Sequence, residues 1–243
     1  MASDLNAIFR PIPEEFEANP HEGEVIPALE LKKNAVDYEK LRGYFLHVPV
    51  EKVRQTFNNT TQYATNMMSG INIQKTIQSP YPAHNVRRRH EPVATDTIFA
   101  QVPAIATGGQ KMAQIFVGRK SLVTNVYGMG STKEFVNTLE DNIRKRGAMD
   151  KLISDSATVE ISARVKDILR MLIIDDWQSE ANFQHQNHAE HRWQHLKRHI
   201  NWFMNWRNMP DYAWLLCLQW VADVMNHTSE KSLNWKPPLQ VLT

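Results

Sequence analysis

The sequence predicts an α/β fold in which helices flank a mixed β-sheet. Three segments rich in β-forming residues, at residues 93–100, 111–118 and 121–127, follow one another with glycine-containing breaks between them. Beyond them, apolar residues at helical spacing alternate with short apolar runs. The resulting order is βββ-α-β-α-β-α-α, which is typical of a mixed sheet covered by helices.

The first helix after these strands is expected over residues 131–146. Ser131 and Glu134 have the spacing of a capping box, and Gly147 is placed to end the helix. Short strands are expected at residues 151–154 and 172–174, with a helix over residues 159–171 between them. Helices are also expected over residues 188–205 and 212–226, and the former carries one apolar face: Trp193, Leu196, Ile200 and Phe203.

These patterns divide the chain into three regions. Residues 1–35 are acidic, contain several prolines and show no periodicity, so we expect an extended or disordered segment. Residues 36–90 contain two short expected helices, the second with Val50, Val53 and Phe57 facing inward, followed by a basic linker. Residues 91–243 form the main domain.

Composition argues against a membrane protein and against a secreted one. The longest apolar runs fall short of the roughly 20 residues that cross a bilayer. The N-terminus lacks the basic, apolar and small-residue sections of a secretory signal. Cys217 is the only cysteine, so no disulfide can form within the chain. We therefore expect an intracellular protein in a reducing compartment.

The charge is distributed unevenly along the chain. Residues 1–35 carry a net charge of −4 and the remaining residues carry +6, for a total of +2. The basic residues cluster at Arg87-Arg88-Arg89, at residues 144–146 and at Lys197-Arg198. Such clusters favour a phosphate-bearing partner, although each one alone is also compatible with solvated surface charge.

A histidine-rich segment at residues 188–199 raises the question of a metal. His188, His191, His195 and His199 follow at steps of 3, 4 and 4, which places them on one face of a helix, as in a two-histidine zinc motif. The HExxH arrangement is absent, and Cys217 is far along the chain. We predict a solvated, basic helix face and no structural zinc site.

Three acids form a different constellation. Asp96 lies in the middle of the first strand, where a carboxylate is costly to bury without a cation. Asp155 follows the strand at residues 151–154, and Glu190 begins the helix at residue 188. If the two strands pair, their carboxylates meet and Glu190 completes a three-oxygen set, which suits Mg²⁺ or Mn²⁺. Each acid alone is also compatible with a helix cap or a salt bridge.

The spacing and local sequence of these acids resemble a known family. The triad is separated by 59 and then 35 positions and stands in the words VATDTIFA, DKLISDSA and HQNHAEHRW. It resembles the D,D-35-E triad in the integrase catalytic core of copia-type LTR retrotransposon polyproteins, within the retroviral integrase and DDE transposase superfamily. The likeness covers about residues 91–243. It implies an RNase H-like mixed five-stranded sheet, and a chain that is a piece of a polyprotein or a decayed copy.

The resemblance also implies an activity. Asp96, Asp155 and Glu190 are expected to hold two Mg²⁺ or Mn²⁺ ions and to catalyse DNA 3′-end processing and strand joining. Double-stranded DNA, as element ends and target, and a homo-oligomer are the implied partners, in the nucleus or a cytoplasmic particle of a eukaryotic cell. The expected nucleic-acid contacts come from the loop and the basic clusters: Gln186, Lys197, Arg198, Arg87, Arg88 and Arg89.

Two other functions remain open from the sequence. One is a non-catalytic nucleic-acid-binding fragment that has kept the basic clusters and lost turnover. The other is an RNase H-type nuclease, which would share the fold and the metal ions but act on a different substrate.

Overall fold

The computed structural model describes residues 36–60, 80–154, 162–178 and 188–242 of the 243-residue chain. The chain divides into two units, Met1–Val36 and Asp37–Thr243, and every described helix and strand belongs to the second. Among the helices in these ranges, none is both long and apolar enough to cross a bilayer.

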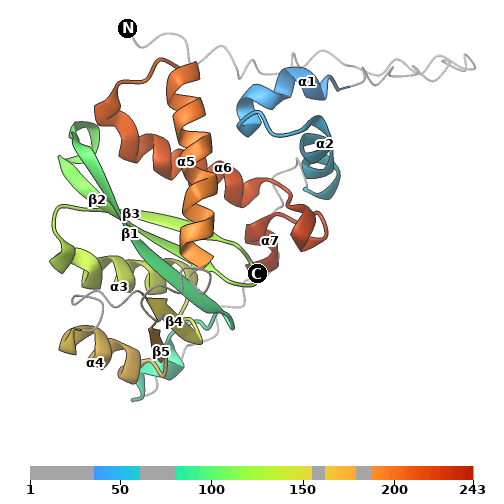
Figure 1. Cartoon of the computed structure of the whole chain (residues 1–243). Coiled ribbons are helices and arrows are strands. Elements are labelled where there is room, and N and C mark those ends of the chain that lie inside the picture. The colour runs from blue at the N-terminus through green and yellow to red at the C-terminus, as the bar shows by residue number, and fades with distance from the viewer. Residues whose placement is uncertain (1–35, 61–79, 155–161, 179–187, 243) are drawn as a thin grey trace, which may run out of the picture. The chain divides into compact units, whose positions relative to one another are not determined.

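A five-stranded mixed sheet forms the centre of the second unit (Figure 1). Its strand order is β3-β2-β1-β4-β5. The long strand β1 pairs antiparallel with β2, and β2 pairs antiparallel with β3, whereas β4 and β5 continue the sheet in parallel from β1. This architecture confirms the predicted fold class. The bounds are β1 Pro92–Ala104, β2 Gln110–Gly118, β3 Thr124–Met129, β4 Lys151–Ser154 and β5 Asp175–Gln178.

Helices cover both faces of the sheet (Figure 1). Helices α3 (Phe135–Arg146) and α4 (Ala163–Met171) pack on one face, around Phe116, Leu139 and Leu152. Helices α5 (His188–Trp206) and α6 (Trp214–His227) pack on the other, around Ile98, Leu196 and Leu218. The predicted apolar face of α5 is confirmed, because Leu196 and Ile200 are buried there and Trp193 and Phe203 pack beside them.

The small N-terminal helices contact the same side of the core as α5. Helix α1 (Tyr38–Leu41) continues into a 3₁₀ turn, Arg42–Phe45, and α2 (Val50–Asn59) follows. The ring of His47 lies 4.1 Å from that of Trp202 on α5, and Lys52 forms an ion pair with Glu230 at 2.5 Å. The C-terminal helix α7 (Pro238–Leu242) was not expected from the sequence.

The edge strand β5 differs from the expectation. The sequence favoured residues 172–174 because they are apolar, but β5 is Asp175–Gln178, with exposed aspartates. Leu172 and Ile174 are instead buried in the core under α4, and Ile173 between them turns the chain with a φ of 53°. Leu172 and Ile174 are thus apolar because they are buried at the end of α4, and not because they form a strand. The residues that pair with β4 are the more polar ones that follow them.

Candidate active site

Asp96 lies on the face of β1 that α5 covers. Ala94 and Ile98, two residues to either side, are both buried in the core cluster shared with α5 and α6. Since alternate residues of a strand face the same side, Asp96 points to that side as well. It is half-buried, and its Oδ1 accepts a hydrogen bond of 2.8 Å from the backbone N–H of Thr97.

Glu190 begins the helix that crosses this face. It is the acidic residue in the first turn of α5, where the helix dipole favours a negative charge. Its neighbour Ala189 is fully buried in the cluster that contains Ala94 and Ile98, and α5 contacts both β1 and β2. Glu190 itself is half-buried. The fold therefore brings the start of α5 to the same face of β1 as Asp96.

The third acid, Asp155, lies outside the described residues, as does Gln186. The pairing of β1 with β4 is described up to Ala94 opposite Ile153, with a constant offset of 59 positions. Asp96 and Asp155 are each the second residue after these partners and are also separated by 59 positions. The described register thus has the offset of the two aspartates but ends before it reaches them, so their meeting stays a prediction.

The donor chemistry fits a hard divalent cation. In the part of the chain that the structure describes, no three histidine, cysteine or acidic side chains converge closely enough to hold a metal ion. The two described members of the predicted set, Asp96 and Glu190, offer carboxylate oxygens, which suit Mg²⁺ or Mn²⁺ better than zinc.

The arginine cluster at residues 87–89 is not a single surface. Arg87 is exposed, whereas the Nη1 and Nη2 atoms of Arg88 donate to the carbonyls of Leu172 and Ile173 at 2.6 and 3.0 Å. Arg89 is fully buried and forms an ion pair with Glu91 at 2.6 Å. The structure thus gives Arg88 and Arg89 roles inside the fold, because their guanidinium groups are already bound, and leaves Arg87 as the exposed cation of the three.

Helix α5 carries cations with different environments. Lys197 and Arg198 are exposed. Arg192 is buried, its Nε donates to Thr124 Oγ1 at 3.0 Å, and burial lowers its pKa. Burial also lowers the pKa of His188, and the nearby Arg119 lowers it further. Arg119, in the turn after β2, is thus a cation near the start of α5 that charge clustering alone did not single out.

The histidines of α5 do not share one environment. His191 and His195 are exposed, whereas His199 is half-buried and its ring donates a hydrogen bond to the backbone of Leu46. Burial lowers the pKa of His199, Lys52, His195 and Arg192 lower it further, and the hydrogen bond to Leu46 raises it slightly. Burial likewise lowers the pKa of His195, followed by Arg192 and Arg198. These two rings lie where the N-terminal helices meet α5.

Acidification should therefore weaken the fold. A folded-state pKa below the unfolded value of about 6.5 means that the unfolded chain binds more protons, so the stability from this group is full above pH 6.5 and is lost as the pH drops from about 6.5 to the folded pKa. Solvent screening keeps the slope for His199 below the limit of about 1.4 kcal/mol per pH unit. Thermal unfolding between pH 7.5 and 5.0 measures it. His199→Gln should reduce the slope, and the exposed His84→Gln should leave it unchanged; equal slopes in all three proteins would contradict the assignment.

We compared the sequence with known families and proteins, and the structure with solved structures. Neither protein-family models nor curated proteins match the sequence. A chain of the simian T-cell lymphotropic virus intasome, solved in complex with PP2A regulatory subunit B56 gamma, matches with a TM-score of 0.50 and 11% identity. The match covers 64% of this chain, which spans only 56% of that one.

Isolated catalytic cores give similar matches. The catalytic core domain of BIV integrase matches with a TM-score of 0.50 and 11% identity, over 63% of this chain and 93% of that one. The HTLV-2 integrase catalytic core, solved with magnesium in a dimeric form, matches with a TM-score of 0.47 and 13% identity, over 63% and 94%. The chain thus has the fold of retroviral integrase catalytic cores, a mixed five-stranded sheet flanked by helices.

Proposed function

We propose that this chain catalyses DNA integration as a metal-dependent polynucleotidyl transferase of a copia-type retrotransposon. It would trim the 3′ ends of the element's DNA and join them to target DNA. The single observation that carries the proposal is the position of Asp96 and Glu190. Asp96 lies between Ala94 and Ile98 on the face of β1 that α5 covers, and Glu190 lies in the first turn of α5 beside Ala189, which is buried in the same cluster. The sheet has the topology of integrase cores.

In this proposal Asp96, Asp155 and Glu190 hold two Mg²⁺ or Mn²⁺ ions. Such ions, when bound, lower the pKa of an attacking water or 3′-hydroxyl and offset the charge that develops on the phosphate. The half-buried position of Asp96 suits this role, because a carboxylate removed from water is stabilised by a cation. Attack forms one phosphorus–oxygen bond and breaks another, so no covalent bond to the protein is needed.

The exposed cations would hold DNA. Lys197 lies seven residues after Glu190, two helical turns along the same face of α5, and Arg198 is exposed beside it. Arg87 is the exposed member of its cluster, and Gln186 precedes α5. Double-stranded DNA is the expected partner, and a homo-oligomer is the expected assembly, because joining two DNA ends requires two active sites.

Substrate choice tests the proposal against its alternatives. Purified full chain is incubated with Mg²⁺ and either a labelled DNA duplex with a recessed 3′ end plus target DNA, or an RNA–DNA hybrid. The proposal predicts joined DNA products and an intact hybrid. Degraded RNA in the hybrid would instead indicate an RNase H-type nuclease, and DNA binding without products would indicate a non-catalytic fragment.

Lys197→Ala should weaken DNA binding without affecting the fold. An exposed lysine that contacts one phosphate contributes about one unit to the slope of log affinity against log salt. We expect that slope to decrease by roughly one and the thermal stability to stay within about 0.5 kcal/mol of wild type. Fluorescence anisotropy at several salt concentrations measures the slope, with the exposed Lys111→Ala as a control. Unchanged affinity at low salt would remove Lys197 from the DNA-binding surface.

A further inference from the structure

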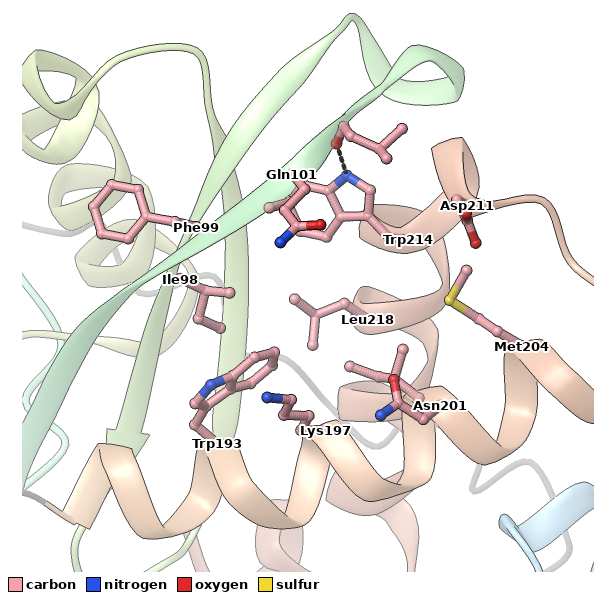
Figure 2. Close-up of a pocket in the computed structure, with 13 residues that line it drawn as sticks. Ile98, Phe99, Gln101, Trp193, Lys197, Asn201, Met204, Asp211, Trp214 and Leu218 are labelled. Atoms are coloured by element: carbon pink, nitrogen blue, oxygen red, sulfur yellow. Dashed lines mark hydrogen bonds between the residues drawn. The ribbon is translucent and has the colours of Figure 1, made fainter.

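A cavity of about 440 Å³ opens between the end of β1, the middle of α5 and the start of α6 (Figure 2). Its floor is apolar and includes Ile98, Ile200 and Leu218. The indole Nε1 of Trp214 donates a hydrogen bond of 2.9 Å to the carbonyl of Val102, which fixes this ring as one wall. The volume lies within the roughly 300–1,000 Å³ of small-molecule sites in proteins.

Polar and aromatic side chains line the cavity above its apolar floor. Lys197 lines it together with Trp193, and both project from α5 toward β1 and α6 in Figure 2. The carboxamides of Gln101 and Asn201 lie on opposite sides, from β1 and from α5. Indole rings stack on nucleobases, carboxamides donate to and accept from base edges, and an ammonium group binds phosphate. The combination suits a base that carries a phosphate.

The charges of the cavity limit how many phosphates fit. Lys197 is the only cation among its lining residues, and Asp211 is the only acid. One ammonium group can neutralise a single phosphate, and the carboxylate at the α6 side repels further ones. The lining therefore fits a nucleoside monophosphate or one nucleotide of a strand, and it does not fit a triphosphate.

The position of the cavity relative to Glu190 connects it to the candidate active site. Trp193, Lys197 and Asn201 follow Glu190 by 3, 7 and 11 residues, so all four lie along one face of α5. At 1.5 Å per residue, the face from Glu190 to Asn201 is about 16 Å long. A strand whose phosphate lies near Glu190 can follow this face into the cavity.

We propose that the cavity binds one unpaired nucleotide next to the reacting phosphate, with its base between the indoles and its own phosphate on Lys197. This inference rests on the proposed function, because it gives the cavity a role in holding the DNA end. A mononucleotide should nevertheless bind by itself. The hydrogen bond from Trp214 to the Val102 carbonyl holds one of the two indoles in place, so little ordering of that ring accompanies binding.

Calorimetric titration of the full chain tests the cavity separately from catalysis. The probes are 2′-deoxyadenosine 5′-monophosphate, deoxyadenosine and inorganic phosphate, all in EDTA so that a carboxylate-bound metal ion cannot contribute. We expect the monophosphate to bind at least about tenfold more tightly than either fragment, because base and phosphate are held together.

Two charge-matched variants assign the phosphate contact. Lys197→Met should bring the affinity for the monophosphate down to that for deoxyadenosine, whereas Arg198→Met, which removes the neighbouring exposed cation outside the cavity, should leave it unchanged. Asn201→Ala should weaken the binding of both base-containing probes to a similar extent. Thermal unfolding of each variant shows that the fold is retained.

The outcomes separate this inference from the proposed function. Monophosphate binding that is no tighter than that of phosphate alone, or equal losses in the Lys197 and Arg198 variants, would overturn the nucleotide site. Strand joining by a protein that fails to bind the monophosphate leaves the function and removes the site. Monophosphate binding without any strand joining would support the nucleotide site and contradict the proposed function.

Discussion

Glu190→Gln should lower strand joining by about a thousandfold or more while leaving most of the DNA affinity in place. The substitution keeps the size of the side chain but replaces a charged oxygen ligand with a neutral amide. Metal ions contribute several kcal/mol to transition-state stabilisation, and each 1.4 kcal/mol corresponds to a tenfold change in rate. The exposed cations of α5, Lys197 and Arg198, remain available to DNA. The measurement is a strand-joining time course beside a DNA-binding titration on the same protein.

A surface carboxylate provides the matched control for this prediction. Asp167 on α4 is exposed and forms a loose ion pair with Arg170 at 3.9 Å. Asp167→Asn removes one negative charge on the opposite side of the sheet, so strand joining should stay within about twofold of wild type. If Glu190→Gln behaved like Asp167→Asn, Glu190 would have no part in the chemistry.

Glu91→Gln should destabilise the protein by about 3–5 kcal/mol, the largest stability effect we expect from a near-isosteric change. Glu91 is buried with Arg89, and its carboxylate accepts from Arg89 Nε and Nη2 at 2.8 and 2.6 Å. It also accepts from the Ser121 hydroxyl and from the backbone N–H groups of Lys120 and Ser121. The substitution leaves a buried guanidinium without its counter-charge. Chemical denaturation measures the loss.

Two variants show whether charge is the cause. Adding Arg89→Met to Glu91→Gln removes the unpaired cation while the amide oxygen still accepts from the backbone, so much of the lost stability should return. Asp141→Asn breaks the exposed pair with Arg144 and should cost less than about 1 kcal/mol. A double variant as unstable as the single one would show that the loss arises from packing.

The buried ion pair between Arg89 and Glu91 was not predicted from the sequence. Three consecutive arginines predict a phosphate-binding surface, but consecutive residues of an extended chain face opposite sides. Arg89 and Glu91 are two positions apart and share the buried side, a signal that the sequence did contain. Glu91 also binds the turn after β2, and this changes where the next strand starts. The sequence predicted a strand from residue 121, but β3 begins at Thr124, because the Ser121 hydroxyl donates to Glu91 and Leu122 has a φ of 60°.

The order of elements was accessible from local patterns because β1, β2, β3 and the helices each carry their own periodicity. Helix α3 shows the limit of that approach: Phe135, Leu139 and Ile143 are buried as predicted, yet the hydroxyl of Ser131 forms no capping hydrogen bond. Glu134 instead accepts from the backbone N–H of Gly130. A capping motif predicts a helix start more reliably than it predicts the hydrogen bonds made there.

The acidic residues of the candidate site could be predicted from their local sequence, whereas the cavity could not, because it is formed by segments that meet only in the folded chain. Asp96 and Glu190 were identified from their contexts, and their neighbours Ala94, Ile98 and Ala189 share one core cluster, while the triad itself stays a prediction. The cavity beside them was missed, because Val102 and Trp214 meet from positions 112 residues apart. Only the one-turn spacing of Trp193 and Lys197 on α5 hinted at a shared surface.

A metal centre at Asp96 makes strand joining depend both on Mg²⁺ and on this carboxylate. Wild type and Asp96→Asn are compared at increasing Mg²⁺ concentrations, with EDTA as the zero point and with thermal unfolding to show that the variant is folded. Because Asp96 lies on the face of β1 under α5, we predict joining by wild type that rises with Mg²⁺ and no joining by folded Asp96→Asn at any concentration. Equal joining by both proteins, or joining by wild type that persists in EDTA, would contradict a carboxylate-bound metal centre at this site.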